Sequence, residues 1–115
     1  MQQSVQALMA NGLPPNSEHR EQILGLAVKY RLPSITWWTD IAESAEVFLA
    51  YAPDYPYYLL RWVDEVGQTL KGVPPADIPI QQPTKLILAI NLRTAKAIGV
   101  DVPSELVLTA DKVIE

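Results

Sequence analysis

The sequence predicts a mixed α/β domain in which parallel strands alternate with helices. Short apolar runs of strand length recur along the chain, and the segments between them carry apolar residues at the i, i+3, i+4, i+7 spacing of a helix. The 115 residues are 49% hydrophobic and 19% charged, which is enough apolar material for the core of one small domain.

The N-terminal third predicts a strand, a helix and a second strand. Val5 to Met9 forms the first apolar run, and a Gly-Pro-Pro loop follows it. Asn16 or Ser17 can cap the helix, and Pro33 forbids its continuation. The stripe expected to be buried consists of Ile23, Leu26, Ala27 and Tyr30. The second strand is expected at 34–38.

The middle of the chain predicts a third strand and the longest helix. A short helical piece is expected at 40–45 and the strand at 47–51. Asp54 can cap the long helix, Pro56 fits its first turn, and Gly72 stops it. Its stripe, which we expect to be buried with Trp62 in the core, consists of Leu59, Trp62, Val63, Val66 and Leu70.

The C-terminal third predicts an extended segment, a fourth strand and two short helices. The strand lies in "TKLILAI" and runs directly into a helix. The side chain of Asn91 can cap that helix by accepting from the backbone N–H of Thr94, and Gly99 closes it. Pro103 opens a last helix, which carries Leu106, Ala110, Val113 and Ile114.

Composition excludes several function classes. The net charge is −4 and the nine basic residues are spread along the chain, which argues against nucleic-acid binding. There are no cysteines, His19 is the one histidine, and no nucleophile or phosphate-binding motif occurs, so we expect no metal, no cofactor and no catalytic residue. No apolar run reaches the roughly 20 residues that cross a bilayer, and the first residues do not form a signal peptide.

Five ordered features mark the second half of the chain: Lys71-Gly72, "PADIP" at 75–79, "QPTK" at 82–85, "NLRTAK" at 91–96 and a proline-led segment at 103–114 that ends in "ADKVI". In these features the chain resembles the substrate-binding proteins of ABC transporters of the tryptophan/tyrosine-binding type. Upstream, "HREQILGLAVKYRLPSI" and "FLAYAPDYPYYLLRWVDEVGQTLKG" resemble further units of that family. The chain departs from it at 45–52, where alanines replace a glycine-rich motif.

The resemblance implies the C-terminal portion of a two-lobed fold, the type I periplasmic-binding-protein fold. Residues 1–48 would end the second lobe, and 49–115 would form the crossover, the long helix and the last strand and helices. The implied function is that of a solute-binding component, or a fragment of one, which captures a small organic solute such as an aromatic amino acid and delivers it to an ABC permease. The implied location is periplasmic or at the cell surface.

Four residues are candidates for ligand binding: Asn11, Trp38, Thr39 and Tyr51. Trp37, Trp38 and Thr39 end a predicted strand, where α/β folds place ligands, but one Trp could instead face the core while the other caps a helix. Asn11 could present its amide to a ligand, or form with Gly12 a turn in the left-handed conformation. The hydroxyl of Tyr51 could reach the cleft, or the ring could pack a hinge strand.

An alternative function is a stand-alone oligomerisation or interaction domain without ligand binding. In the resembled fold, the four apolar runs would be divided between two sheets that are each completed by strands absent from this chain. Short residual sheets leave unpaired edges, so we expect the chain to form a homo-oligomer.

Overall fold

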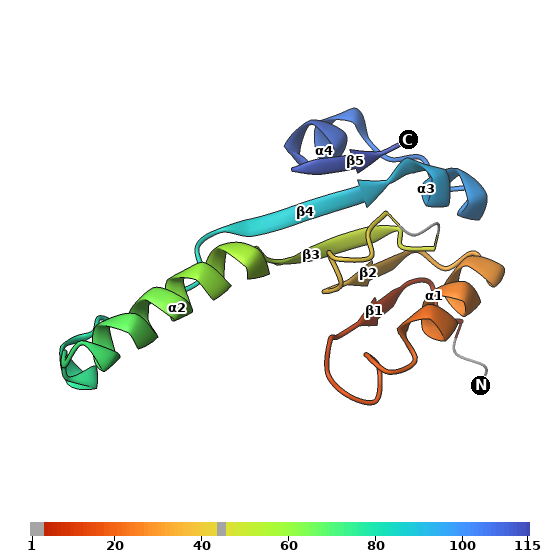
Figure 1. Ribbon diagram of the computed structural model, residues 1–115. Coiled ribbons are helices and arrows are strands. Elements are labelled where there is room, and N and C mark those ends of the chain that lie inside the picture. The colour runs from red at the N-terminus through yellow and green to blue at the C-terminus, as the bar shows by residue number, and fades with distance from the viewer. Residues whose placement is uncertain (1–3, 44–45) are drawn as a thin grey trace. The chain divides into compact units, whose positions relative to one another are not determined.

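The computed structural model describes residues 4–43 and 46–115. In this part of the chain, strands and helices alternate, and the strands form one five-stranded sheet in the order β1-β2-β3-β4-β5 (Figure 1). The elements are β1 (Leu8–Ala10), α1 (Arg20–Lys29), β2 (Ser34–Thr36), β3 (Leu49–Pro53), α2 (Tyr55–Leu70), the 3-10 helix η1 (Pro75–Asp77), β4 (Leu86–Asn91), α3 (Leu92–Ile98), α4 (Ser104–Thr109) and β5 (Lys112–Ile114). The predicted α/β class is confirmed.

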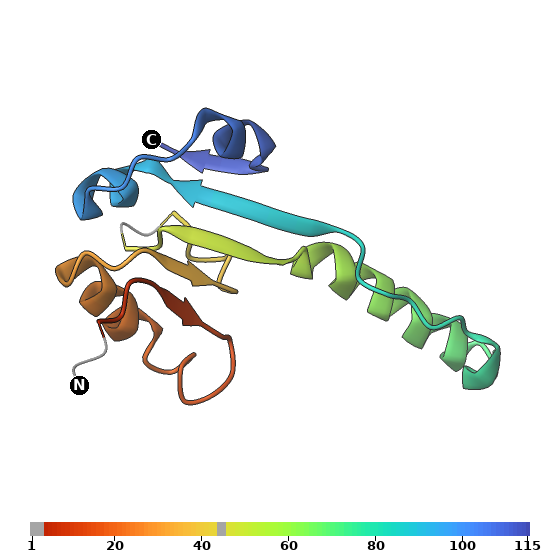
Figure 2. The same ribbon diagram turned by 180° about the vertical axis from the view of Figure 1, so that it is seen from behind.

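The sheet is mostly parallel. β1 pairs with β2, β2 with β3, and β4 with β5, all in parallel register. β3 and β4 run in opposite directions, as two backbone hydrogen bonds show. Asn91 N–H donates to the carbonyl of Phe48 at 2.9 Å, and Asp54 N–H donates to the carbonyl of Lys85 at 3.0 Å. The rear view in Figure 2 shows the same run of strands. All the predicted strands therefore belong to one sheet, and the expected division between two sheets is wrong.

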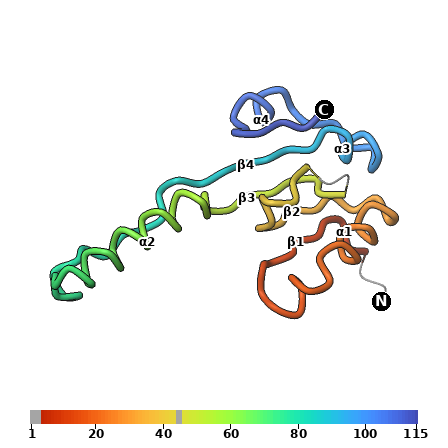
Figure 3. The backbone as a smooth tube through the Cα atoms, in the orientation of Figure 1, coloured from red at the N-terminus to blue at the C-terminus, as the bar shows by residue number. Residues whose placement is uncertain are grey.

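The chain divides into two compact units. The first, unit 1, comprises Met1–Ala52 and Ile87–Glu115, and the second, unit 2, comprises Pro53–Leu86. Figure 3 traces the backbone out of the sheet through β3 and back through β4. The predicted boundary between residues 48 and 49 concerns the parts of a larger protein and stays a prediction.

Unit 1 holds the core. One buried cluster comprises Ala10, Leu24, Trp38, Ala42, Val47, Ala50, Ala89 and Ile114, and a second comprises Phe48, Ala95 and Ile98. In β2 the small polar residues Ser34 and Thr36 are buried, whereas Ile35 between them is only half-buried. Thr36 lies between Ala10 and Ala50 in the strand register. The strands thus present small side chains to the core, which lets the covering segments approach closely.

The start of α1 and its buried face differ from expectation. The helix begins at Arg20, and its N-cap position is His19 without a side-chain hydrogen bond, so the predicted caps at Asn16 and Ser17 are wrong. Leu24 and Ala27 are the buried helix residues, while Leu26 and Tyr30 are exposed. The core contact therefore lies to one side of the predicted stripe.

The predicted helical piece at 40–45 is not a helix where it is described. Residues 40–43 form turns, and Ser44 and Ala45 lie outside the described residues. The strand that follows begins at Leu49, two residues later than predicted.

The ends of α2 are as predicted, but its burial is not. Asp54 accepts from the backbone N–H of Tyr57 at 3.2 Å, Pro56 lies in the first turn, and Gly72 takes a left-handed φ of 96° just after the helix. Tyr58 is the buried residue of the helix. The predicted buried stripe, with Trp62, is exposed, because unit 2 contains only the helix, η1 and an extended return segment to pack against it.

Among the C-terminal elements, the predicted cap of α3 is confirmed, and the predicted extent of the last helix is wrong. Asn91 caps α3 by accepting from Thr94 N–H at 3.1 Å, and Gly99 ends the helix with a φ of 76°. α4 stops at Thr109, and Lys112–Ile114 is strand β5 where the sequence predicted helix. Val113 and Ile114 are β-branched residues that favour strands, and in the pairing with β4 Ile114 is buried while Val113 is half-buried.

Candidate functional site

The strand register relates three residues at neighbouring positions of β1, β2 and β3. Ala10 lies opposite Thr36, and Thr36 lies opposite Ala50. The next positions along these strands are Asn11, Trp37 and Tyr51. Adjacent strands are about 4.8 Å apart, and successive side chains point to opposite faces. Asn11 and Trp37 therefore directly follow the carboxyl ends of β1 and β2, and Tyr51 comes next to the buried Ala50 within β3.

Trp37 is the accessible aromatic residue at this place. Its side chain is 50% exposed, whereas Trp38 is 6% exposed and belongs to the core of unit 1. Of the two alternatives for this pair, the one in which a Trp faces the core holds for Trp38. A ligand contact by Trp38 stays a prediction. If the burial of Thr36 had been known, strand alternation would have predicted that the side chain of Trp37 is exposed.

The loop after β1 lies against the two tryptophans. A Cβ atom at Gly12 would be 3.7 Å from Nε1 of Trp38 and 3.9 Å from Cβ of Trp37. A side chain at position 12 would therefore meet both tryptophans at ordinary van der Waals distances. Trp38 belongs to the core of unit 1, whereas Trp37 is exposed.

Asn11 has a structural role that the sequence left open. Its Oδ1 accepts from the backbone N–H of Leu13 at 3.3 Å and from Nδ2 of Asn16 at 2.9 Å, which makes a side-chain-stabilised turn. A left-handed conformation was one alternative for this turn, and it is not found. The positive φ angles of the described residues lie at Arg31, Gly72 and Gly99. A ligand contact by Asn11 stays a prediction.

Thr39 and Tyr51 are also placed close to the end of β2. The backbone N–H of Thr39 donates to the carbonyl of Trp37 at 3.1 Å, so a turn follows the strand and no helix is capped there. Tyr51 is 45% exposed between the buried Ala50 and Ala52. Their roles in binding stay predictions, and the arrangement offers one ring for stacking with hydroxyl and amide groups around it.

Charged groups near this place form one ion pair. Arg20 donates to Asp40 at 3.0 Å, directly after Thr39 in the chain. Among the described residues there is no group of three or more histidine, cysteine or acidic side chains that could hold a metal ion. No helix in the same part of the chain is long and apolar enough to cross a membrane.

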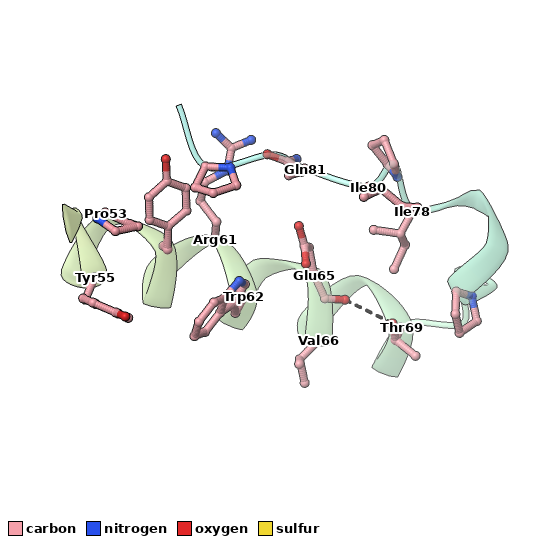
Figure 4. A pocket seen from close by; sticks show the side chains of 14 residues that line it. Pro53, Tyr55, Arg61, Trp62, Glu65, Val66, Thr69, Ile78, Ile80 and Gln81 are labelled. Atoms are coloured by element: carbon pink, nitrogen blue, oxygen red, sulfur yellow. Dashed lines mark hydrogen bonds between the residues drawn. The ribbon is translucent and has the colours of Figure 1, made fainter. Parts of the chain in front are cut away.

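A separate groove lies within unit 2, between α2 and the return segment. Its volume is about 730 Å³, and its lining includes Tyr58, Arg61, Trp62, Glu65, Ile78 and Gln81. In Figure 4, Arg61 and Glu65 point toward the return segment, whereas Trp62 and Val66 point to the other side of the helix. None of the four candidate ligand residues lines this groove. Small-molecule sites are usually more enclosed than this groove is.

Comparisons with known proteins find fold neighbours but no sequence relatives. No family model matches the sequence, and no curated protein matches it. A conserved domain protein from Vibrio cholerae O1 biovar eltor superposes with a TM-score of 0.84 at 19% identity over 94% of this chain and 36% of its own. The ABC domain from Streptococcus pneumonia in complex with L-Trp superposes with a TM-score of 0.79 at 20% identity over 96% of this chain and 38% of its own.

These two likenesses show the fold. Identities of 19% and 20% establish a shared arrangement of strands and helices and not a shared activity. This chain spans little more than a third of the length of either neighbour. The chain therefore has the mixed α/β architecture of one part of each of these larger proteins.

Proposed function

We propose that this chain is part of a solute-binding component of an ABC importer. It would take part in capturing a small organic solute, such as an aromatic amino acid, for delivery to a membrane permease. The observation that carries this proposal is the match of 96% of the chain, at a TM-score of 0.79, to an ABC domain in complex with L-Trp. The family resemblance of the sequence points to the same class. The location that goes with this function is the periplasm or the cell surface.

The site proposed for the solute is the carboxyl end of β1 and β2. Trp37 supplies an exposed ring on which a flat or apolar solute can stack. Asn11, Thr39 and Tyr51 supply amide and hydroxyl groups nearby, and Trp38, the fourth proposed residue, lies in the core behind them. Open α/β sheets bind ligands outside the carboxyl ends of their strands, which is where this group lies.

The proposed activity is reversible binding without catalysis. The four proposed binding residues and Trp37 include no pair of nucleophile and base, since an amide, a threonine hydroxyl, a phenol and two indoles do not supply one. In a two-lobed binding protein, closure of the lobes encloses the solute. This chain would form part of one wall, and the remaining walls would come from a longer protein.

A titration followed by NMR tests the proposal on the complete 115-residue chain. We expect L-Trp and L-Tyr to shift the amide resonances of residues 11–13, 37–39 and 51, with a dissociation constant in the millimolar range or weaker, because part of the cleft is missing. The matched controls are Trp37→Ala, which should abolish the shifts, and Trp62→Ala, which removes an equally exposed ring from unit 2.

Two results would contradict the proposal. Shifts confined to residues of α2 would place binding elsewhere, and unchanged shifts in Trp37→Ala would remove the aromatic ring from the site. A micromolar constant for the chain alone would contradict the statement that the site is only partly present.

A further inference from the structure

The indole N–H of Trp38 is a hydrogen-bond donor without a partner in the described part of the chain. The hydrogen bond that Trp38 makes to a described side chain uses its backbone N–H, which donates to Oγ1 of Thr36 at 3.3 Å. No described group accepts a hydrogen bond from Nε1 of Trp38. An indole nitrogen donates and does not accept, so only an acceptor can satisfy it.

This N–H reaches the surface although the rest of the side chain lies in the core. Trp38 is only 6% exposed and belongs to the buried cluster that includes Ala10 and Leu24. Among the described residues, every buried side-chain nitrogen or oxygen has a hydrogen-bond partner. Since Nε1 of Trp38 has none, it belongs to the small part of this side chain that is accessible. The core and the bond to Thr36 hold the ring, so the donor is fixed in place.

Glycine at position 12 leaves the space beside this donor open. A Cβ atom there would be 3.7 Å from Nε1 of Trp38 and 4.0 Å from Cε3 of Trp37. The N–H and the exposed ring of Trp37 therefore border the same small space, which a larger residue than Gly12 would partly fill. The backbone conformation does not require glycine at this position, because the positive φ angles of the described glycines lie at Gly72 and Gly99.

Asn11 adds a second side chain that can only donate. Its Oδ1 already accepts from the N–H of Leu13 at 3.3 Å and from Nδ2 of Asn16 at 2.9 Å, which uses both lone pairs. Its own Nδ2 donates to no described group. The unused hydrogen-bonding capacity of the Asn11 and Trp38 side chains is thus donor only. Such donors suit a carboxylate, because hydrogen bonds to an ionised acceptor are roughly twice as strong as neutral ones, and they offer nothing to an ammonium group.

We propose that the indole N–H of Trp38 and the Nδ2 amide of Asn11 bind the carboxylate of the solute, while its flat part stacks on Trp37. The inference rests on the proposed function and names the solute class, an aromatic compound that is selected by its carboxylate and not by an ammonium group. An acceptor in the remainder of a longer protein is the competing partner of this N–H. It predicts that the N–H of Trp38 does not respond to a solute.

The indole N–H resonances of the isotope-labelled 115-residue chain test the proposal. The chain has three tryptophans, so their resonances can be assigned with Trp37→Phe and Trp62→Phe. We expect L-Trp and indolepropionate, which both carry a carboxylate, to move the resonance of Trp38 downfield. Tryptamine has the same ring and an ammonium group but no carboxylate, and it should leave this resonance in place.

Gly12→Ala and Gly67→Ala form a matched pair of variants. The new methyl group at position 12 meets Nε1 of Trp38 at an ordinary van der Waals distance, so the chain should keep its unfolding midpoint while L-Trp loses most of its effect on the Trp38 resonance. A methyl group at position 67 of α2 meets nothing within 4 Å. Gly67→Ala should therefore respond to L-Trp like the natural chain.

The outcomes separate this inference from the proposed function. A Trp38 resonance that stays in place while L-Trp shifts the backbone amides of residues 11–13, 37–39 and 51 would overturn the inference and leave the proposed function standing. If L-Trp shifts none of these resonances, both fail. An equal downfield shift with tryptamine would overturn the assignment of the carboxylate, and an undiminished response of Gly12→Ala would overturn the approach of the solute to Nε1 beside position 12.

Discussion

Asp54 and Lys85 are joined twice, once through the backbone and once through their side chains. Asp54 N–H donates to the carbonyl of Lys85 at 3.0 Å, and Nζ of Lys85 donates to Oδ2 of Asp54 at 2.7 Å. The same carboxylate caps α2 through Tyr57 N–H, while Lys85 N–H donates to the hydroxyl of Tyr58 at 2.6 Å. The residues at the two ends of unit 2 are thus tied to each other and to the first turn of its helix.

This arrangement predicts how the stability of unit 2 depends on pH. The hydrogen bond from Lys85, followed by that from Tyr57, lowers the pKa of Asp54 from its ordinary value of 3.8, although burial opposes the shift. The bond to Asp54 raises the pKa of Lys85 above 10.5. The contribution of Asp54 to the free energy of unfolding is complete above pH 3.8 and is lost as the pH falls through the lowered pKa of this group. The contribution of Lys85 is complete below pH 10.5 and is lost as the pH rises through the raised pKa of this group.

Urea unfolding of Lys85→Gln against the natural chain measures this contribution. We expect Lys85→Gln to be less stable at neutral pH, and the difference should vanish as the pH falls through the lowered pKa of Asp54 and the carboxylate takes up its proton. Lys112→Gln is the control, because it removes the more exposed pair with Glu43 and should have a smaller effect at neutral pH. A stability difference that persists unchanged at low pH would refute the role of the ion pair.

Replacing Asn91 should destabilise unit 1. Asn91 is buried, caps α3 through Thr94 N–H at 3.1 Å, and donates to the carbonyl of Ala42 at 3.4 Å. Asn91→Ala removes the cap and should cost about 1–3 kcal/mol of unfolding free energy. Asn91→Ser keeps an oxygen that can cap, so it should recover part of the loss. Equal unfolding midpoints of Asn91→Ala and the natural chain would show that this joint adds nothing to stability.

The three tryptophans should differ in their access to acrylamide. In single-tryptophan variants with phenylalanine at the other two positions, Trp37 should be quenched readily and Trp38 poorly, because their side chains are 50% and 6% exposed. Trp62 should resemble Trp37, because it is exposed to a similar extent. Equal quenching of Trp37 and Trp38 would contradict the assignment of Trp38 to the core.

Truncating Trp38 and Trp62 should affect stability very differently. Trp38 packs in the core of unit 1, so Trp38→Ala should cost about 3–5 kcal/mol. Trp62 is exposed, and Trp62→Ala should change the unfolding free energy of the monomer by less than about 1 kcal/mol. Unfolding measured by circular dichroism in dilute solution separates the two. A large loss for Trp62→Ala would contradict the exposure of this face of α2.

The features that the sequence determined by itself are local. Asp54 and Asn91 cap their helices, and Gly72 and Gly99 end theirs in the left-handed conformation, because each depends on a side chain or a backbone angle within a few residues. The alternation of strands and helices, and hence the α/β class, follows from the periodicity of apolar residues. The apolar face of α2 that carries Trp62 was also visible in the sequence, from its helical spacing.

Only the tertiary structure decided which faces are covered. The stripe with Trp62 is apolar, yet it is exposed, because periodicity identifies a face and not the element that packs on it. In β2 the buried residues are Ser34 and Thr36, and the apolar Ile35 between them is only half-buried, since neighbouring strands fix the register and leave room there for small side chains. Val113 and Ile114 became strand β5 because β4 offers them an edge that lies more than 20 residues away in the chain. Burial and pairing depend on such distant contacts, and for this reason the position of Trp37 beside Asn11 came from the fold and not from the sequence.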